Sequence, residues 1–600
     1  MPLGECPQDC FALFDDDHGT ARLLSGYRRS FSFDGNLDGA ALDAAFAATE
    51  MAVGQGEWVA LAASYELGAL LEPAVRRDPT RQPLLRGWVF GQSECLDAAG
   101  VAAFLHERLS RLSDQQRVAG IAEVRPALDL DGYVTKVQQI RRWIAEGDCY
   151  QINLTFPLRF RYFGHPLALY AGLRRRQPVR HGAYLSVPGG PLLSLSPELF
   201  FERRGRRVVT RPMKGTAPRG STPIEDAENR CALLASAKER AENIMIVDLL
   251  RNDLGRLADA GKVRVDALCE AEAYPTLWQS VSTVSAEMPD VGLRDLFTAL
   301  FPCGSITGAP KIRAMQRIAE LEDSPRGIYT GSIGWLAPGG DCRFNVAIRT
   351  PELGVDGYGR LGIGGGIVID AQPEREYAEC LLKARFLTGF DPGFELIETL
   401  RLEQGRYPFL ELHLQRLSSS AVALGFACPM SEIRDALQRR AAGNGVGLHR
   451  VRLTLAHSGE WGATSVAFLD DPLSKSAIIA SEVLDSSDYL LRHKTSVRSR
   501  YDGALKSLEG VPGAFDAIFL NSRGEVCEGA RSNVFVERDG VLLTPPLHCG
   551  LLPGVLRRHL LESGRAVERV LTREDLFGDA SVYLGNALRG LVRVTVSPRS

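Results

Sequence analysis

Four glutamates stand at matching spacing in two segments with helical periodicity. Glu239 and Glu242 lie in one segment, and Glu376 and Glu379 lie in another that continues to Lys383. Residues three and seven apart on a helix share a face, so these side chains can point the same way. If the two faces met, four carboxylates would repel one another unless a hard cation such as Mg²⁺ lay among them. The alternative is that both are ordinary solvated helix faces.

Six longer motifs occur in order from residue 196 to residue 384. They read SPELFFERRGRRVVTRPMKGTAPRG, AENIMIVDLLRNDLGR, FPCGSITGAPKIRAMQRIAELE, GIYTGSIGWL, FNVAIRT and GGGIVIDAQPEREYAECLLKA. The series resembles the chorismate-utilising enzymes, which include anthranilate, aminodeoxychorismate, isochorismate and salicylate synthases. The resemblance implies a two-layer α/β fold with a large antiparallel sheet and an active site between the layers.

One motif separates the members of this family. Where Lys214 stands, anthranilate synthases resemble the motif but carry alanine, whereas aminodeoxychorismate synthases carry lysine. The resemblance implies that Lys214 attacks ring carbon 2 of chorismate and expels the carbon-4 hydroxyl, after which ammonia adds at carbon 4 and the lysine leaves. The lysine must be neutral to attack, and burial or a nearby cation would lower its pKa. Gly215 and Thr216 are expected to contact the substrate.

The same resemblance implies roles for residues around the lysine. Glu198 matches the general acid that protonates the leaving hydroxyl. Mg²⁺ would hold the ring carboxylate through Glu242 and Glu379, with Glu239 and Glu376 in support. Arginine forks bind carboxylates, and glycines let backbone N–H groups approach a ligand. The remaining residues expected to contact the substrate are Tyr329, Arg349, Gly364, Gly366 and Lys383.

A second series of motifs follows residue 393. It reads FELIETLRLEQGRYPFLELHLQRLSSSAVALGF, HKTSVRSRYDGAL, FDAIFLNSRGEVCEGARSNVFVERDGVLLTPP, CGLLPGVLRR and YLGNALRGLVRV. The series resembles the fold-type IV pyridoxal-phosphate enzymes: branched-chain and D-amino-acid aminotransferases and aminodeoxychorismate lyase. The resemblance implies a C-terminal domain of this fold with pyridoxal 5′-phosphate as its cofactor.

Pyridoxal phosphate needs a lysine for its aldehyde, an acid for its pyridine nitrogen, and cations or helix N-termini for its phosphate. Lys494 matches the Schiff-base lysine, which would act as base and acid once freed. Glu528 matches the partner of the pyridine nitrogen, and Arg416 matches the phosphate arginine. The N–H groups of Val555 and Leu556, at the start of a predicted helix, can hold phosphate oxygens.

The motifs alone do not separate a lyase from an aminotransferase. Fusion to an aminodeoxychorismate synthase favours the lyase, whose substrate is that enzyme's product, and Arg589 is a candidate contact for the substrate carboxylate. Two departures leave other outcomes open. The domain starts directly at Phe394, and Leu455-Ala456-His457 stands where relatives often place an arginine. An inactive lyase, an aminotransferase or a purely structural module are the alternatives.

The periodicity of the chain predicts the elements that position these residues. Residues 149–215 alternate with period two, which predicts a large antiparallel sheet. A turn signal at Asp391-Pro392-Gly393 is followed by a new order of strand, helix, strand. The predicted helices are Asp131 to Asp148, Ile224 to Ala258, Ala309 to Leu321 and Pro373 to Leu387.

These patterns predict an α/β (α+β) protein of more than one domain. A chain of 600 residues is too long for one hydrophobic core, and 45% hydrophobic with 24% charged residues is typical of a soluble enzyme. We predict the N-terminal part of the synthase at residues 1–125, a chorismate-binding catalytic domain at 126–390 and a pyridoxal-phosphate domain at 394–600.

Composition and cysteine usage narrow the partners. A net charge of −3 is not typical of a nucleic-acid-binding protein. Neither a membrane span nor a signal peptide is evident in the sequence, so a cytoplasmic enzyme is expected. None of the 12 cysteines stands in the Gly-x-Cys-x-Gly turn of a glutamine amidotransferase. The chain would therefore aminate chorismate with free ammonia or with ammonia from a separate glutaminase subunit.

Together the two domains would supply 4-aminobenzoate for folate biosynthesis. Relatives of the C-terminal domain commonly dimerise, so a homodimer through that domain is expected. The main rival is an anthranilate synthase-type enzyme with an unrelated second domain, against which Lys214 and the fused domain argue.

Overall fold

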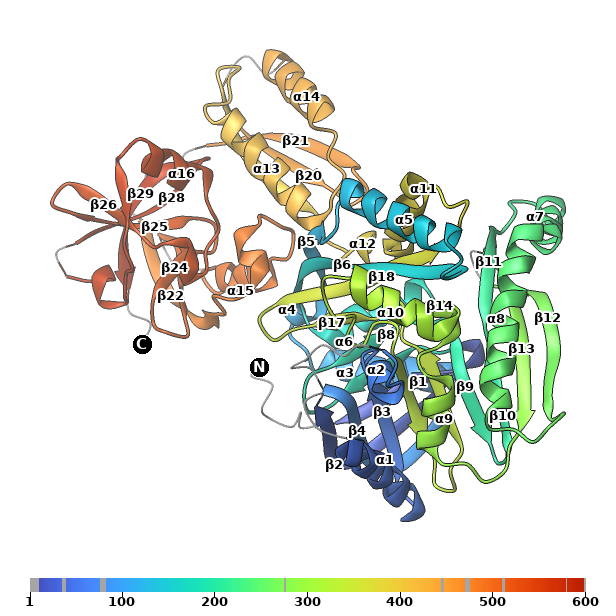
Figure 1. Ribbon diagram of the computed structural model, residues 1–600. Helices are drawn as coiled ribbons and strands as arrows, with labels where there is room; N and C mark the ends of the chain where they lie inside the picture. Colours follow the sequence, from blue (N-terminus) through green and yellow to red (C-terminus); the bar gives the residue numbers. More distant parts are fainter. Residues whose placement is uncertain are drawn as a thin grey trace. The chain divides into compact units, whose positions relative to one another are not determined.

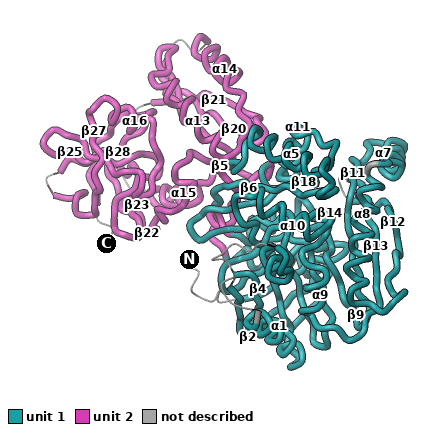
Figure 2. The backbone as a smooth tube through the Cα atoms, in the orientation of Figure 1, with its two compact units in different colours: residues 1–111, 124–162, 166–388 teal, residues 112–123, 163–165, 389–600 magenta. Residues whose placement is uncertain are grey.

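The computed structural model describes residues 10–34, 39–75, 83–274, 277–443, 447–469, 475–509, 513–578 and 580–597. The chain divides into two compact units (Figure 2). Unit 1 comprises residues 1–111, 124–162 and 166–388, and unit 2 comprises residues 112–123, 163–165 and 389–600. The predicted boundaries at residues 125, 390 and 394 stay predictions. Among the described helices, none combines the length and apolar character needed to cross a membrane.

A 13-stranded sheet forms the frame of unit 1 (Figure 1). Its strands are β1 (Phe11–Asp15), β2 (Ala21–Asp34), β3 (Trp58–Ala63), β4 (Pro83–Leu96), β7 (Ala183–Ser186), β8 (Leu192–Ser194), β9 (Leu199–Arg204), β10 (Arg207–Arg211), β11 (Met213–Pro218), β12 (Val263–Ala273), β13 (Leu277–Glu287), β15 (Ser332–Leu336) and β16 (Cys342–Val346). Their order is β11-β13-β10-β9-β16-β15-β3-β4-β2-β1-β7-β8, and β12 also pairs with β13. The chain thus returns to this sheet from distant parts of its sequence.

A second sheet of unit 1 contains β6 (Gln151–Phe163) and β18 (Tyr358–Ile367), which pair antiparallel. β14 (Gly308–Ala309) pairs with β6, and β17 (Pro351–Leu353) pairs with β18. The strands predicted over residues 149–215 therefore belong to two sheets rather than one. Period-two alternation reveals a strand but not its partner, so the sequence pattern could not show this division.

The helices of unit 1 follow the predicted segments with three differences. Ser236 is extended and its side chain accepts a hydrogen bond from Glu239 N, so the segment predicted as one helix from Ile224 is divided there. The helix predicted from Ala309 begins after Pro310, and that predicted from Pro373 to Leu387 is divided near residue 384. The helices are α1 (Gly39–Gly54), α2 (Leu67–Leu71), α3 (Ala98–Ser110), α5 (Leu130–Ala145), α6 (Pro166–Arg176), α7 (Pro223–Ala235), α8 (Ala237–Gly255), α9 (Leu293–Leu300), α10 (Lys311–Leu321), α11 (Pro373–Lys383) and α12 (Arg385–Thr388).

Unit 2 contains two sheets. A three-stranded antiparallel sheet consists of β19 (Leu396–Glu403), β20 (Leu448–Leu455) and β21 (Trp461–Ala467). The strands of an 8-stranded sheet are β22 (Lys475–Leu484), β23 (Ala514–Asn521), β24 (Val526–Gly529), β25 (Asn533–Arg538), β26 (Val541–Thr544), β27 (Ala566–Glu568), β28 (Ser581–Asn586) and β29 (Gly590–Ser597). The helices are α13 (Leu410–Leu424), α14 (Met430–Gly443), α15 (Ser499–Lys506) and α16 (Val555–Glu562). Strand, helix and strand follow residue 393 as predicted, with α14 as an additional helix.

Two short segments from earlier in the chain complete the core of unit 2. Residues 112–123 include α4 (Asp114–Arg117) and the start of β5 (Gly120–Pro126). Ala122 and Phe163 are buried in one apolar cluster with Phe394, and the two phenylalanine ring centroids are 6.1 Å apart. The core of unit 2 therefore depends on residues far outside 394–600.

Candidate active sites

Lys214 lies on β11, which is an end strand in the order of the 13-stranded sheet, and it centres the first candidate site. The register between β11 and β13 shifts between Met213 and Thr216, and such irregularities re-aim side chains. Gly215 has φ +83°, which glycine adopts without strain. A Cβ there would lie 2.7 Å from Glu239 Oε2, so the carboxylate approaches the backbone beside Lys214.

Charges of both signs surround Lys214. Burial lowers the pKa of Lys214 and outweighs the carboxylates of Glu242, Glu198 and Glu239, which raise it. Lys383 lowers this pKa further. A lowered pKa enlarges the neutral fraction that a nucleophilic lysine needs. The structure thus brings five of the predicted site residues together.

Glu198 is 4% exposed and immediately precedes β9. Ser305 Oγ donates a hydrogen bond of 2.7 Å to Glu198 Oε1. Burial raises the pKa of the Glu198 carboxyl to about 7, although the Ser305 hydroxyl and Lys214 both lower it. A substantial fraction of Glu198 is therefore protonated at neutral pH, as a general acid requires.

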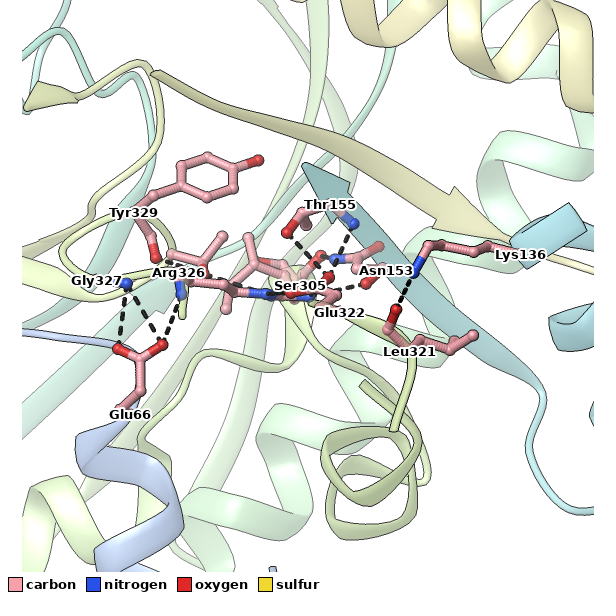
Figure 3. A network of polar contacts seen from close by, with 12 residues as sticks. Glu66, Lys136, Asn153, Thr155, Ser305, Leu321, Glu322, Arg326, Gly327 and Tyr329 are labelled. Carbon is pink, nitrogen blue, oxygen red and sulfur yellow. Dashed lines mark hydrogen bonds and ion pairs between the residues drawn. The ribbon is translucent and has the colours of Figure 1, made fainter. Parts of the chain in front are cut away.

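A buried polar network holds Ser305 (Figure 3). Through its hydroxyl, Ser305 in turn holds Glu198. Asn153 Nδ2 donates 2.9 Å to the Ser305 carbonyl, and Arg326 Nη2 donates 2.9 Å to the Asn153 carbonyl. Arg326 also forms a 2.8 Å ion pair with Glu322, and the two side chains are 2% and 8% exposed. None of these supporting residues was predicted from the sequence, although Ser305 and Glu322 lie inside one of the quoted motifs.

Arg326→Ala is expected to lower the free energy of unfolding by about 3–5 kcal/mol, because it leaves the Glu322 carboxylate buried without its partner. Urea-induced unfolding followed by circular dichroism measures this change. Arg251→Ala is the matched control, since the Arg251–Asp248 pair is 54% and 61% exposed and contributes about 0–1 kcal/mol. Equal effects of the two substitutions would contradict a buried structural role for Arg326.

The four glutamates of the predicted magnesium site lie on two helices, Glu239 and Glu242 on α8 and Glu376 and Glu379 on α11. Within the described residues, no group of three or more His, Cys, Asp or Glu side chains is arranged to hold a metal ion. Mg²⁺ commonly takes one or two carboxylates, with waters and substrate oxygens as its other ligands. A magnesium site completed by substrate therefore fits these residues and stays a prediction.

Lys383 and the glycines of β18 adjoin the α11 glutamates. Lys383 Nζ lies 3.0 Å from Glu379 Oε1 and donates 3.1 Å to the Gly364 carbonyl. A Cβ on Gly364 would collide with the backbone of β6, and one on Gly366 would collide with Gln151. Close packing of β6 and β18 thus accounts for both glycines, and their contact with substrate stays a prediction.

Arg349 and Tyr329 line different cavities of unit 1. Arg349 lines a cavity of about 40 Å³ together with Pro197 and Met213, next to Glu198 and Lys214 in the sequence. Tyr329 is 8% exposed and lines a cavity of about 140 Å³. Contact of either side chain with the substrate stays a prediction.

A cavity of about 260 Å³ in unit 2 forms the second candidate site. Lys494, Glu528, Arg416, Arg589 and Val555 all line it, so the structure collects these predicted residues in one place.

Lys494 is fixed to β19 through its backbone. Ile397 N donates 2.9 Å to the Lys494 carbonyl, and Leu396 forms a β-bridge with Thr495. Burial and the neighbouring guanidinium of Arg416 lower the pKa of Lys494 to about 8. An amine with this pKa is partly neutral at physiological pH and can react with an aldehyde.

Glu528 is buried on β24 and held at both carboxylate oxygens. Tyr501 Oη donates 2.6 Å to Oε1, and Leu552 N donates 2.9 Å to Oε2. Burial raises the pKa of Glu528 to about 7. A cationic partner would favour its ionised form, and a protonated pyridine nitrogen is such a partner. Tyr501 lies inside a quoted motif, but its contact could not be inferred from sequence.

Arg416 projects from α13 and binds a buried carboxylate on β19. Its Nε and Nη2 donate 2.8 and 2.6 Å to the two oxygens of Glu398, and His413 Nδ1 lies 2.6 Å from the same carboxylate. Although burial raises it, Arg416 and His413 bring the pKa of Glu398 down to about 2. Arg416 Nη1 also donates 3.4 Å to the Pro553 carbonyl, just before α16.

The first turn of α16 supplies donors beside Arg416. No side chain caps this end of the helix, so its first N–H groups can bind an anion. A Cβ on Gly554 would collide with Asn533, so glycine lets β25 approach the turn. Val555 lines the cavity, while the Leu556 side chain is buried in an apolar cluster beside it. Lysine, acid, arginine and helix terminus together fit pyridoxal phosphate.

Two family models match the chain, one in each part. Residues 8–389 match the model of chorismate binding enzymes, and residues 395–596 match the model of class IV amino-transferases.

Individual relatives agree with the first match. Aminodeoxychorismate synthase of Streptomyces pristinaespiralis is 40% identical over 332 residues, which is 54% of this chain and 45% of that protein. Aminodeoxychorismate synthase component 1 of Escherichia coli strain K12 is 43% identical over 248 residues, which is 41% of this chain and 54% of that protein. The chain thus spans about half the length of the curated relatives it matches.

A solved structure shares the fold of the first part. Anthranilate synthase component I from Streptococcus pneumoniae TIGR4 has a TM-score of 0.53 and 24% identity, over 62% of this chain and 92% of that chain. The prediction of a chorismate-utilising region followed by a class IV domain is confirmed. The class IV fold of the second part implies pyridoxal phosphate. The chain belongs to the family of chorismate binding enzymes, and it carries a class IV amino-transferase domain after that region.

Proposed function

We propose that this chain aminates chorismate with ammonia to 4-amino-4-deoxychorismate and then eliminates pyruvate to give 4-aminobenzoate. The observation that carries the first step is a buried Lys214 of lowered pKa beside Glu198, whose pKa is raised to about 7. Both relatives described above are named aminodeoxychorismate synthases, which supports the same step. The proposal for the second step rests on the cavity around Lys494.

In the first step, Lys214 Nζ forms a bond to ring carbon 2. The carbon-4 hydroxyl leaves with its bonding electrons and takes the proton of Glu198, so that water departs. Ammonia then bonds to carbon 4, the bond from Lys214 to carbon 2 breaks, and the proton lost by the new amine returns to Glu198. The residues that would hold Mg²⁺ are Glu239, Glu242, Glu376 and Glu379. The bound ion would balance the negative charge of the substrate carboxylate.

The rate of amination is expected to fall as the pH rises through about 7, because the Glu198 carboxyl then loses the proton that it must donate. The Ser305 hydroxyl lowers the pKa of Glu198. Ser305→Ala should therefore move this alkaline fall to higher pH. Profiles of kcat/KM, recorded with the concentration of free ammonia held constant, test both statements. An alkaline limb that Ser305→Ala leaves in place would reject Glu198 as its origin.

In the second step, bound pyridoxal phosphate supplies an electron sink that weakens the C–H bond at the amine-bearing ring carbon. Lys494 Nζ takes that proton and returns one to the methylene carbon of the departing pyruvate. The bond between the ring carbon and the ether oxygen of the enolpyruvyl group breaks, and the ring becomes aromatic. Glu528 would favour a positive charge on the pyridine nitrogen, and Arg416 with the first turn of α16 would hold the phosphate.

The partners belong to the same proposal. We place chorismate at the site around Lys214, in a cytoplasmic enzyme that receives ammonia from a separate glutamine amidotransferase. The name component 1 in the relative from Escherichia coli supports a second component. A homodimer through the C-terminal domain completes the proposed assembly.

Product analysis tests the proposed function. The full chain is incubated with chorismate, Mg²⁺, ammonium and pyridoxal phosphate, and the products are separated by chromatography. Formation of 4-aminobenzoate with an equal amount of pyruvate is expected. Anthranilate would overturn the synthase assignment. Accumulation of 4-amino-4-deoxychorismate alone would overturn the lyase and favour an inactive or aminotransferase domain.

A further inference from the structure

Two arginines of β20 line the cavity of unit 2 and belong to none of the groups assigned so far. Arg450 and Arg452 are exposed, whereas Val451 and Leu453 between and beside them are 0% and 1% exposed. Successive residues of a strand face opposite sides, so Arg450 and Arg452 share one side and both guanidinium groups project from the cavity face of the three-stranded sheet. Neither guanidinium group forms a hydrogen bond or ion pair with any residue that the structure describes.

The positions across from these arginines carry no acid. In the register of β19 and β20, Arg450 pairs with Arg401 and Arg452 pairs with Thr399. On the other side, β21 places a valine and a threonine opposite them. Like charges directly opposite each other on a sheet are destabilising. Arg401 forms a 3.0 Å ion pair with Glu403, so the positive charge that an anionic ligand would stabilise on this face is that of Arg450 and Arg452.

The acids that line the same cavity are already engaged. Asp488 lies 3.3 Å from Arg500 Nη2 and accepts a hydrogen bond from Leu490 N. Glu528 accepts from Tyr501 and from a backbone N–H. These carboxylates do not neutralise the β20 arginines, so a ligand must bring the anion.

The distance between Lys494 and Arg452 follows from the strand pairing and matches the length of a small cyclic substrate. Ile397, which binds the Lys494 backbone, and Thr399, which pairs with Arg452, both line the cavity two residues apart on β19. With strands about 4.8 Å apart and alternate residues about 6.6 Å apart, the backbones at Lys494 and Arg452 are roughly 12 Å apart. One six-membered ring and the two side chains span such a gap.

We propose that Arg450 and Arg452 bind a carboxylate of the substrate in the unit 2 cavity. Guanidinium forks match carboxylates in bidentate geometry. The inference rests on the proposed lyase step, whose substrate carries one carboxylate on its ring and another on its enolpyruvyl ether. The residues proposed to hold the cofactor phosphate are different ones, namely Arg416 and the first turn of α16. The β20 arginines thus select a dianionic substrate.

Equilibrium binding of two inert probes tests the proposal. The probes are 3-(carboxymethoxy)benzoate, which has both carboxylates, and 3-methoxybenzoate, which has only the ring carboxylate. They are titrated into the full chain loaded with pyridoxal phosphate, with the absorbance of the bound cofactor as readout. Arg450→Gln and Arg452→Gln should each raise the dissociation constant of the first probe about tenfold or more, because each removes a charged hydrogen-bond donor. The affinity for the cofactor should not change.

The second probe shows which carboxylate is bound. Weakening of the dicarboxylate alone assigns the arginines to the ether-borne group, and weakening of both probes assigns them to the ring carboxylate. Arg439→Gln, an exposed arginine on α14, is the matched control and should leave both constants unchanged.

Unchanged constants for both probes in both variants would overturn the proposal, whatever product the enzyme makes. If the unaltered chain forms no 4-aminobenzoate but the variants still weaken probe binding, the lyase step fails and the arginine site stands. Titration calorimetry supplies the same constants if the chain shows no cofactor band.

Discussion

Lys214→Ala is expected to lower the rate of 4-amino-4-deoxychorismate formation by roughly 10³-fold or more, because the substitution removes the nucleophile of a covalent route. Lys214→Arg should fail as well, since a guanidinium stays protonated and cannot attack carbon 2. Purified enzyme with chorismate, Mg²⁺ and ammonium provides the assay. Without ammonia, intact-mass measurement should detect chorismate less water on the unaltered chain and not on Lys214→Ala.

The control for this experiment is Lys262→Ala, an exposed lysine of the same unit between α8 and β12. It should keep full amination activity. Full activity of Lys214→Ala would show that ammonia attacks chorismate directly. The general-acid role of Glu198 could then remain, but the covalent route would be wrong.

Lys494→Ala is expected to abolish the absorbance of protein-bound cofactor and to reduce formation of 4-aminobenzoate by roughly 10³-fold or more, because one side chain both holds the aldehyde and moves the proton. Amination at Lys214 should continue, so 4-amino-4-deoxychorismate should accumulate. Spectra of the chain supplied with pyridoxal phosphate and chromatography of the products measure the two effects.

Lys506→Ala on α15 is the matched control, because Lys506 is an exposed lysine of the same unit. Its spectrum and its product should equal those of the unaltered chain. If Lys494→Ala retained the cofactor band, another lysine would have to hold the aldehyde. A chain that lacked the band without any substitution would indicate a structural module.

The family and the fold class could be predicted because the ordered motifs carry both. The motifs around Lys214 and Lys494 each resemble those of one known family. The family matches confirm that the chain combines these two families. The pairing of the strands could not be predicted from the sequence. β6 lies between β4 and β7 of the large sheet in the sequence, yet it pairs with β18 some two hundred residues later. Alternation specifies a face and not a neighbour.

The environment of the site residues was also beyond the sequence. Glu198 and Glu528 have raised pKa values because burial removes water from a carboxylate, and burial depends on packing of distant segments. Arg326 looks like any charged loop residue until its buried pair with Glu322 is seen. Arg450 and Arg452 read as a solvated strand face, because the sequence does not say which face borders a cavity.

Unit 2 is built from discontinuous parts of the chain, which has a consequence for its expression without the rest of the chain. Ala122 and Phe163 complete its core, and Gln115, which donates 3.1 Å to Ser499 Oγ, lines its cavity. A cistron cut at the turn near residue 392 would encode a C-terminal polypeptide without these three residues. Such a polypeptide would lack part of the apolar cluster of unit 2 and the hydrogen bond to Ser499, so its free energy of unfolding should be lower than that of unit 2 in the full chain.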